Sequence, residues 1–462
     1  MPKLWEALLT LAILIAALAV GIIIFGVDPH VPMFVGVMAA AIMALHLGYK
    51  WDEVEKSMMD GIYKALQSIC ILIIVGILIG VWINAGVVPT MIYYGLKVLK
   101  PAIFFIACVL ICSITSLATG TSWGTMGTMG VALMGIGFGL GMSPGMTAGA
   151  VLSGAYFGDK MSPLSDTTNL APAMAGTTVF THVKHMVVTA GPSIIISLII
   201  YAIMGFTVVK GTARMETIDL YMGTLKEFFT ISPVMLIPPL CVLLMVIFKV
   251  PAIPGLIGVS ALGGIFAAIF QKANLATILA SMYTGVSMDT GVAEINRLVN
   301  RGLSSMLDTV ALILIALAFA GVVETTGAVH AIIEKILSKA KSDKAMMTTA
   351  IFATLFTNFA TAAQYVAIVL PGRMFREAFR ERGLHPKNLS RILEDVGTIC
   401  APFCPWSTDG VYILATLGCA TAAYAPYMFF SMLCPIVSLI CIWTGWTITR
   451  ITPEQAKEDI IP

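Results

Sequence analysis

The chain has 462 residues and a formal net charge of +2, and 58% of its residues are hydrophobic while only 11% are charged. Soluble domains carry about 25% charged residues, so this composition excludes an ordinary soluble protein and predicts a membrane protein. The chain has no Lys/Arg-rich run interleaved with aromatic residues, so no nucleic-acid partner is predicted.

An apolar run from Leu4 to about Val27 opens the chain. A signal peptide has a hydrophobic region of about 7–15 residues before a small-residue cleavage site. This run is longer and is followed by Asp28, Pro29 and His30. We therefore predict a retained first transmembrane helix, followed by further apolar runs of membrane-spanning length.

Two polar segments interrupt the apolar sequence of the first half. Residues 119–125 include Thr121 and Ser122, and residues 158–172 combine ionisable, hydroxyl and amide side chains with two prolines. Ionisable groups at membrane depth are costly, so they are functional candidates by default. The candidates in the second segment are Asp159, Lys160, Ser165, Asp166, Thr167, Thr168 and Asn169.

Three of the charged residues allow more than one interpretation. Asp159 and Lys160 form either a structural ion pair at a helix end or a site in which Lys160 neutralises an anion and Asp159 titrates. Asp308 lies in an apolar run without a cation close in sequence. It either takes up a proton or makes a structural hydrogen bond.

The apolar run at residues 345–371 has lysines before it and arginines after it. By the positive-inside rule both flanks are cytoplasmic, and a segment whose ends share one side is a re-entrant hairpin rather than a crossing. Its polar centre, with Thr357, Asn358 and Thr361, would be the tip. Residues 119–125 are the equivalent tip in the first half.

Residues 402–409 form a second proline-broken polar loop, which ends in Ser407, Thr408 and Asp409. A hard cation such as Na⁺ prefers oxygen ligands, and broken helices offer them as carbonyls, hydroxyls and carboxylates. Burial favours the protonated acid, whereas a bound cation favours the carboxylate. Asp166 and Asp409 are therefore the preferred Na⁺ ligands, because each can exchange a proton for Na⁺.

The two halves of the chain match each other in order. Five residues of the first half match five of the second half in order and at one constant interval. The first-half residues are Gly61, Gln67, Gly80, Asn84 and Gly86, and their matches are Gly302, Asp308, Gly321, Thr325 and Gly327. Thr119-Gly120 also aligns with Thr357-Asn358, and Gly158 and Pro163 align with Gly397 and Pro402. We predict a first transmembrane repeat at 1–210, a polar linker at 211–230, a second repeat at 231–450 and a short tail at 451–462.

Inverted repeats are the architecture of many secondary transporters, whose sites lie where broken helices meet near the midplane. The predicted fold is an all-α polytopic membrane protein with two inverted repeats, paired re-entrant hairpins and broken helices. No enzyme or cofactor is predicted. The chain has no phosphate-binding loop, and the Gly120-Thr-Ser-Trp-Gly segment lacks the strands and the His and acid partners of a hydrolase serine.

Several of these stretches resemble the signature stretches of the NhaC family of Na⁺/H⁺ antiporters. They are the segments 120–125, 158–172, 181–185, 364–372 and 406–409. The resemblance implies a bacterial or archaeal cytoplasmic-membrane protein with inverted repeats and paired hairpins that forms a homodimer. It also implies that Na⁺ and H⁺ are transported.

The resemblance leaves two activities open, because the family also contains exchangers of the malate/lactate type. In a Na⁺/H⁺ antiporter, the tip residues would contribute to the cation pathway or cap half-helices. In an organic-acid exchanger, the same residues and Lys160 would bind the substrate carboxylate; these residues are Thr121, Ser122, Thr357, Asn358 and Thr361. No arginine at membrane depth is evident for a dicarboxylate, so Na⁺/H⁺ exchange is the leading hypothesis.

Overall fold

The computed structural model describes residues 2–64, 66–208, 215–248, 250–292, 295–296, 299–337 and 340–451. Within these ranges the regular structure is helical and no strand occurs, as the sequence predicts. The elements of the first half are α1 (Leu4–Ala19), η1 (Val20–Ile24), α2 (His30–His46), α3 (Trp51–Tyr63), α4 (Leu66–Asn84), α5 (Val87–Val98), α6 (Pro101–Thr119), α7 (Ser122–Thr125), η2 (Met126–Gly130), α8 (Val131–Gly139), α9 (Pro144–Met161), α10 (Asp166–Ala175) and α11 (Val179–Val208).

The second half repeats this pattern of long helices interrupted by short ones. Its elements are α12 (Met215–Phe228), η3 (Pro233–Leu236), α13 (Ile237–Ile247), α14 (Ala252–Phe270), α15 (Leu275–Thr284), η4 (Leu303–Met306), α17 (Leu307–Thr326), α18 (Ala328–Leu337), α19 (Asp343–Thr361), α20 (Gln364–Glu381), α21 (Pro386–Ile392), η5 (Leu393–Thr398), η6 (Ala401–Phe403), α22 (Thr408–Leu417), α23 (Thr421–Tyr424), η7 (Ala425–Tyr427) and α24 (Phe429–Thr444). The range predicted as a polar linker contains α12, which packs against α5.

Five helices in the described ranges are long and apolar enough to cross a membrane, and three bent helix pairs raise the number to eight if each pair is one span. One of the five, Leu4–Ile22, is the N-terminal helix that the sequence predicts. The bent pairs turn by 69°, 97° and 56°. The protein is therefore a multi-pass helical membrane protein with broken spans.

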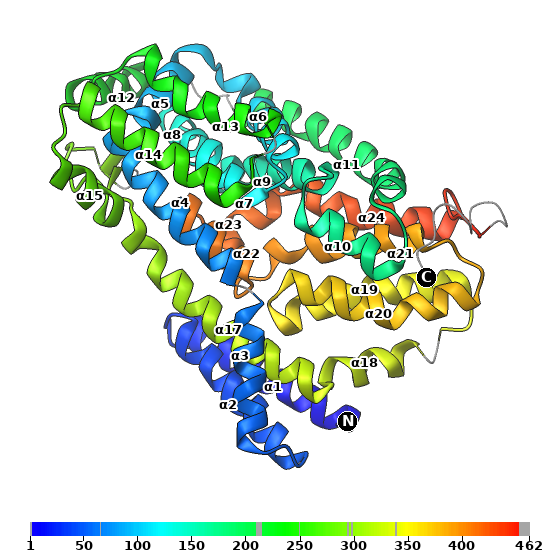
Figure 1. Cartoon of the computed structure of the whole chain (residues 1–462). Coiled ribbons are helices and arrows are strands. Elements are labelled where there is room, and N and C mark those ends of the chain that lie inside the picture. The colour runs from blue at the N-terminus through cyan, green and yellow to red at the C-terminus, as the bar shows by residue number, and fades with distance from the viewer. Residues whose placement is uncertain are drawn as a thin grey trace.

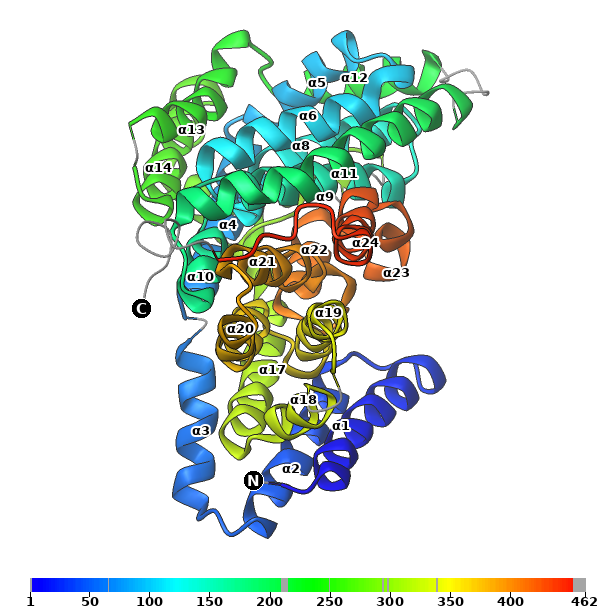
Figure 2. The ribbon, with the colours of Figure 1, turned by 90° about the vertical axis from the view of Figure 1, so that its right-hand side faces the viewer.

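The helices form three groups that both ribbon views separate. Helices α1, α2, α3, α17 and α18 lie together at one end, and α5, α6, α8 and α12 lie at the other (Figures 1 and 2). Between them lie α9, α10, α19, α20 and α22, which carry most of the predicted polar segments. The polar segments from both halves of the sequence thus meet in the middle group.

A helical hairpin occurs at each predicted tip. Helix α6 turns at Gly120, whose φ is 68°, before α7 starts at Ser122. Helix α19 turns at Ala362, whose φ is 56°, before α20 starts at Gln364. The second turn therefore lies just after the predicted tip residues. In the structure the turn at Gly120 corresponds to the turn at Ala362, whereas the sequence comparison aligned Thr119-Gly120 with Thr357-Asn358.

Left-handed residues recur at nearly the same interval in the two halves. Gly86 separates α4 from α5 with a φ of 77°, and Gly327 separates α17 from α18 with a φ of 74°. Gly176 and Gly418 likewise end α10 and α22. Because left-handed backbone favours glycine, these positions mark the same helix breaks in both halves.

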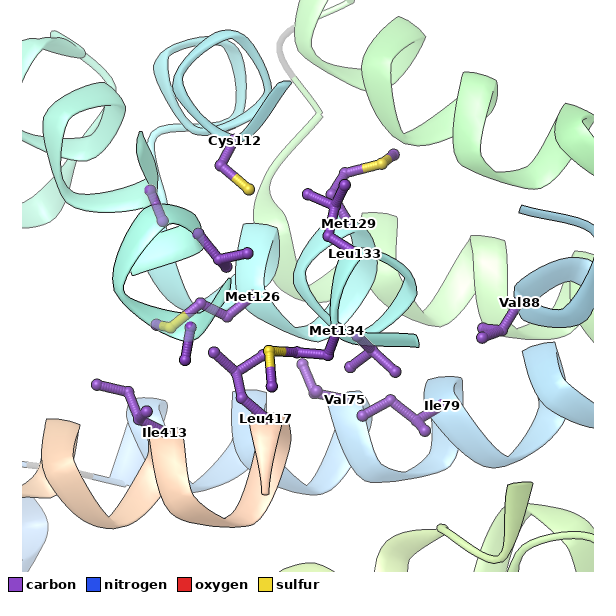
Figure 3. Close-up of a cluster of buried hydrophobic side chains, with 14 of the residues drawn as sticks. Val75, Ile79, Val88, Cys112, Met126, Met129, Leu133, Met134, Ile413 and Leu417 are labelled. Atoms are coloured by element: carbon purple, nitrogen blue, oxygen red, sulfur yellow. The ribbon is translucent and has the colours of Figure 1, made fainter. Parts of the chain in front are cut away.

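Buried apolar side chains fix the first hairpin in place. Figure 3 shows Met126, Met129, Leu133 and Met134, from the η2–α8 arm, next to side chains from α4 and α22. The partners from these two helices are Val75, Ile79, Ile413 and Leu417. The core therefore joins an arm of the first half to the broken helix α22 of the second half.

Helices α3 and α17 cross at a close glycine contact. A Cβ atom at Gly321 would lie 2.1 Å from the backbone oxygen of Ser57, and one at Gly61 would lie 2.2 Å from that of Leu317. Gly321→Ala should therefore push the helices apart and destabilise the protein by about 1–3 kcal/mol. The melting temperature of detergent-purified protein measures this effect.

Gly258 in α14 provides the matched control, because a Cβ there would meet nothing within 4 Å. Gly258→Ala should leave the melting temperature unchanged or raise it, since alanine favours helix over glycine by up to about 1 kcal/mol. Equal melting temperatures for Gly321→Ala and the unsubstituted protein would contradict the close crossing.

Candidate ion-binding site

A cavity of about 340 Å³ lies where the breaks of several helices meet. Its polar lining comes from the start of α4, the α6–α7 turn, the end of α9 and the starts of α10 and α20. Helices α13 and α14 contribute apolar residues. The polar residues that line it are Gln67, Thr119, Thr121, Ser122, Asp159, Ser165, Asp166, Thr167, Gln364 and Tyr365.

The cavity lining contains acidic side chains without basic ones. Asp159 and Asp166 both line it, and its described lining includes no lysine, arginine or histidine. Two carboxylates in a confined space repel each other until a cation or a proton neutralises one of them. The cavity is therefore suited to a cation.

Asp166 is the first residue of α10 and is exposed toward the cavity. A carboxylate in the first turn of a helix is stabilised by the backbone N–H groups at that end. The Tyr365 side chain, which also lines the cavity, lies beside Asp166. Asp166 therefore keeps carboxylate lone pairs accessible from the cavity, and Tyr365 is a contact that the sequence did not reveal.

Asp159 lies near the end of α9 and is buried against the first hairpin tip. Its Oδ2 atom accepts hydrogen bonds from the backbone N–H of Ser122 at 3.1 Å and from the Ser122 hydroxyl at 2.7 Å. Thr121, the N-cap of α7, accepts from the backbone N–H of Gly124. The sequence-predicted tip therefore contacts the loop at 158–169, with Ser122 as the contact.

The hydroxyl residues around Asp166 have different partners. The Ser165 and Thr167 hydroxyl oxygens lie 3.1 Å apart, and the Thr167 hydroxyl donates to Oε1 of Glu394 at 3.1 Å. The Thr168 hydroxyl donates to the backbone oxygen of Lys160, and the Asn169 amide donates to that of Ser165. Thr168 and Asn169 thus hold the helix break together, whereas Ser165 and Thr167 line the cavity.

Lys160 does not pair with its neighbour Asp159 and does not line the cavity. Its Nζ atom lies 2.7 Å from Oδ1 of Asp395, and both side chains are fully buried. Arg391 lies 3.8 Å from the other oxygen of Asp395, and the Thr189 hydroxyl donates to Oδ1 at 2.8 Å. The interpretation of Asp159 and Lys160 as one ion pair was wrong, because each side chain points to a different partner.

Asp409 is fully buried in the first turn of α22. Its Oδ1 atom accepts hydrogen bonds from the Trp123 indole at 3.1 Å and from the Tyr156 hydroxyl at 2.6 Å. Thr408 donates to the other oxygen at 3.4 Å, and Ser407 caps the helix through the backbone N–H of Gly410. Asp409 lies outside the cavity lining and holds Trp123, which is part of that lining.

The polar residues before the second turn serve the local backbone. The hydroxyls of Thr357 and Thr361 donate to carbonyl groups one helical turn earlier in α19. The Asn358 amide donates to the backbone oxygens of Val396 and Gly397 in the bulged segment η5. The second tip reaches the cavity through Gln364 and Tyr365 instead.

Asp308 lies apart from the other candidates. It is exposed near the start of α17, and its backbone oxygen lies 2.8 Å from Nε2 of His30. The structure thus brings together Asp159, Asp166, Ser165, Thr167 and the first tip, and it leaves Asp308 outside the cavity lining.

Three fully buried charged residues were not predicted from the sequence: Arg391, Glu394 and Asp395. They lie in α21 and in the π-helical segment η5. The available signal was the Arg391–Asp395 spacing of four residues, which places both side chains on one helix face. The arginine-rich flank before it made this segment look like a cytoplasmic loop.

The sequence matches the Na⁺/H⁺ antiporter family over residues 3–155 and 154–446. It is 37% identical over 441 residues to the Na⁺/H⁺ antiporter NhaC of Alkalihalophilus pseudofirmus, covering 95% of each chain. It is 35% identical over 446 residues to the malate-2H⁺/Na⁺-lactate antiporter of Bacillus subtilis, covering 96% of this chain and 95% of that protein. It is also 35% identical over 463 residues to the arginine/ornithine antiporter ArcD of Halobacterium salinarum, covering 99% of this chain and 95% of that protein.

Proposed function

Because the chain belongs to the Na⁺/H⁺ antiporter family, we propose that it exchanges Na⁺ for H⁺ across the cytoplasmic membrane of a bacterium or archaeon. The observation that carries this proposal is the cavity between the helix breaks. Asp159 and Asp166 line it, and no basic side chain does so among the described residues. Such a lining attracts cations and repels free organic anions.

Asp166 is the proposed Na⁺-contacting carboxylate. Na⁺ binds through oxygen atoms, and broken helices place such atoms at membrane depth. Besides the Asp166 carboxylate, the cavity offers the side-chain oxygen of Gln364, which is buried without a hydrogen-bond partner in the described part of the chain. Tyr365, the residue after Gln364, lies beside Asp166 and lines the same cavity. These groups hold the ion as cargo.

Exchange follows from the charge of the cavity. A carboxylate removed from bulk water is stable when it is protonated or when a cation neutralises it. Binding of Na⁺ beside Asp166 therefore opposes the protonation of Asp159 and Asp166, and protonation of these acids opposes Na⁺ binding. If the cavity faces the two membrane sides in turn, this competition couples Na⁺ export to H⁺ import.

The architecture behind alternating access is proposed to be two inverted repeats. The recurring left-handed breaks at Gly86 and Gly327, and at Gly120 and Ala362, support this assignment. Inverted repeats place equivalent broken helices on opposite sides of a central site. The homodimer implied by the family resemblance stays a prediction.

Organic-acid exchange is the second candidate, because one relative is named a malate/lactate antiporter. The chemistry of the cavity is less suited to it. Lys160, the predicted carboxylate partner, is fully buried against Asp395 rather than exposed to the cavity. A substrate carboxylate would therefore need co-bound Na⁺ or protonated aspartates to neutralise the lining.

The deciding experiment uses purified protein in proteoliposomes that contain a pH-sensitive dye. With an imposed pH gradient, addition of Na⁺ as the only exchangeable solute should collapse the gradient, and K⁺ or choline should not. Parallel vesicles should be assayed for uptake of labelled malate and labelled arginine. Absence of Na⁺-dependent pH change, together with uptake of malate or arginine, would replace the proposed function with organic-solute exchange.

A further inference from the structure

Glu394 is a buried acid that the proposed exchange has not yet used. It lies in the π-helical segment η5 and is fully buried. Single π-helical bulges inside α-helices are frequent at functional sites, because the inserted residue redirects neighbouring side chains. The bulge is held by the Asn358 amide, which donates to the backbone oxygens of Val396 and Gly397. Glu394 therefore has a fixed place beside the cavity wall.

The neighbouring Asp395 takes the basic partners. Lys160 and Arg391 both lie within ion-pair distance of Asp395. In the described part of the chain, no lysine or arginine nitrogen lies within ion-pair distance of Glu394. The charged side chains whose fields act on Glu394 are Lys160 and Asp159, both from α9. A buried carboxyl without a direct cation partner is suited to holding a proton.

A row of hydroxyl groups joins Glu394 to the cavity. The Thr167 hydroxyl donates to Oε1 of Glu394 at 3.1 Å. The Ser165 hydroxyl oxygen lies 3.1 Å from that of Thr167, and either can donate to the other. The Ser165 side chain also lies next to the Asp159 carboxyl group. Asp159, Ser165, Thr167 and Glu394 thus form one row of neighbouring polar side chains, with Asp159 at the cavity end.

We propose that these four side chains form a proton relay between the cavity and Glu394, which is the second proton-holding residue of the transporter. The proposal rests on the Na⁺/H⁺ exchange proposed above. When Asp159 carries the proton, its O–H donates to Ser165, Ser165 donates to Thr167, and Thr167 donates to the Glu394 carboxylate. Each hydroxyl gains one proton and loses another, so one proton moves from Asp159 to Glu394 without other bond changes.

The relay gives the proton a place away from the Na⁺ ion. When the proton moves to Glu394, Asp159 becomes a carboxylate at the cavity wall, and the cavity attracts Na⁺ more strongly. When Na⁺ leaves, the same hydroxyls return the proton along reversed hydrogen bonds. At the cavity end, Na⁺ and the proton still compete for the charge of Asp159, so exchange stays coupled.

Thr167→Val tests the relay, because valine has the shape of threonine without the hydroxyl. Two activities are measured in proteoliposomes, namely Na⁺-driven pH change and exchange of labelled for unlabelled Na⁺ at equal pH. We expect Na⁺/H⁺ exchange to slow by about 100-fold, the size of a lost positioned proton-transfer group, while Na⁺/Na⁺ exchange continues. Glu394→Gln should show the same separation of the two activities.

Two controls show whether the hydroxyl itself matters. Thr167→Ser restores the hydroxyl and should recover most of the Na⁺/H⁺ exchange. Thr207→Val removes a hydroxyl that bonds only within α11 and should change neither activity. Normal Na⁺/H⁺ exchange in Thr167→Val, or equal loss of both exchanges in Thr167→Val and Glu394→Gln, would overturn the relay. Lack of Na⁺/H⁺ exchange in the unsubstituted protein would instead overturn the proposed function.

Discussion

Asp166→Asn should abolish Na⁺-dependent proton exchange while leaving the protein folded and inserted. Asparagine keeps the shape of the side chain, but it carries no charge and cannot release a proton. Removing the carboxylate charge that faces the cation should weaken Na⁺ binding by on the order of 100-fold. Binding of labelled Na⁺ and the vesicle pH assay measure the two effects separately.

Asp308→Asn is the matched control for this substitution. Asp308 is an aspartate in the first turn of a helix, like Asp166, but it is exposed outside the cavity lining. Its removal should leave both Na⁺ binding and exchange near those of the unsubstituted protein. Near-normal exchange by Asp166→Asn, or a loss in Asp308→Asn as large as that in Asp166→Asn, would contradict the assignment of the cation to this cavity.

Lys160→Met should be among the most destabilising single substitutions in the chain. It leaves Asp395 in a fully buried place without the cation 2.7 Å away. Breaking a buried ion pair by removing one partner costs about 3–5 kcal/mol. Arg391 remains 3.8 Å from the other oxygen of Asp395, so we expect a loss near the lower end of this range. We expect a lower melting temperature of the detergent-purified protein and a lower yield of inserted protein.

Lys64→Met provides a control with the same bond length in a different environment. Lys64 and Glu324 are also 2.7 Å apart, but their side chains are 51% and 29% exposed. Exposed ion pairs contribute about 0–1 kcal/mol, so this variant should melt close to the unsubstituted protein. Similar melting temperatures for Lys160→Met and Lys64→Met would show that burial does not set the strength of the Asp395 pair.

The sequence was a good guide to the first half of the site because its polar residues interrupt long apolar runs. Asp159, Ser165 and Asp166 stand out at membrane depth, and the structure places all three at one cavity. The helical membrane architecture was predictable from the low charged fraction and the apolar runs of membrane-spanning length. Which atoms touch was not predictable, because Asp159 reaches Ser122 across the fold while the adjacent Lys160 reaches Asp395.

The second half of the site was harder to predict because its signals are ambiguous in sequence. Arg391 follows a series of surface-facing basic residues in the sequence, yet it is fully buried. Ala362 makes the second hairpin turn in a left-handed conformation that normally favours glycine, so the sequence gives no sign of the turn there. Glu394 was not predicted as a site residue, because its contact with Thr167 from the other half of the chain is not visible in the sequence.

The buried pair of Lys160 and Asp395 sets a condition on the biosynthesis of this protein. The two residues are 235 positions apart, and ribosomes add about 5–20 residues per second, so Lys160 emerges roughly 10–50 s before its partner. During this interval a lysine at membrane depth must be kept hydrated or shielded by the insertion machinery. The first half therefore cannot reach its final packing until the second half is translated, and the two halves should become protease-resistant together rather than one after the other.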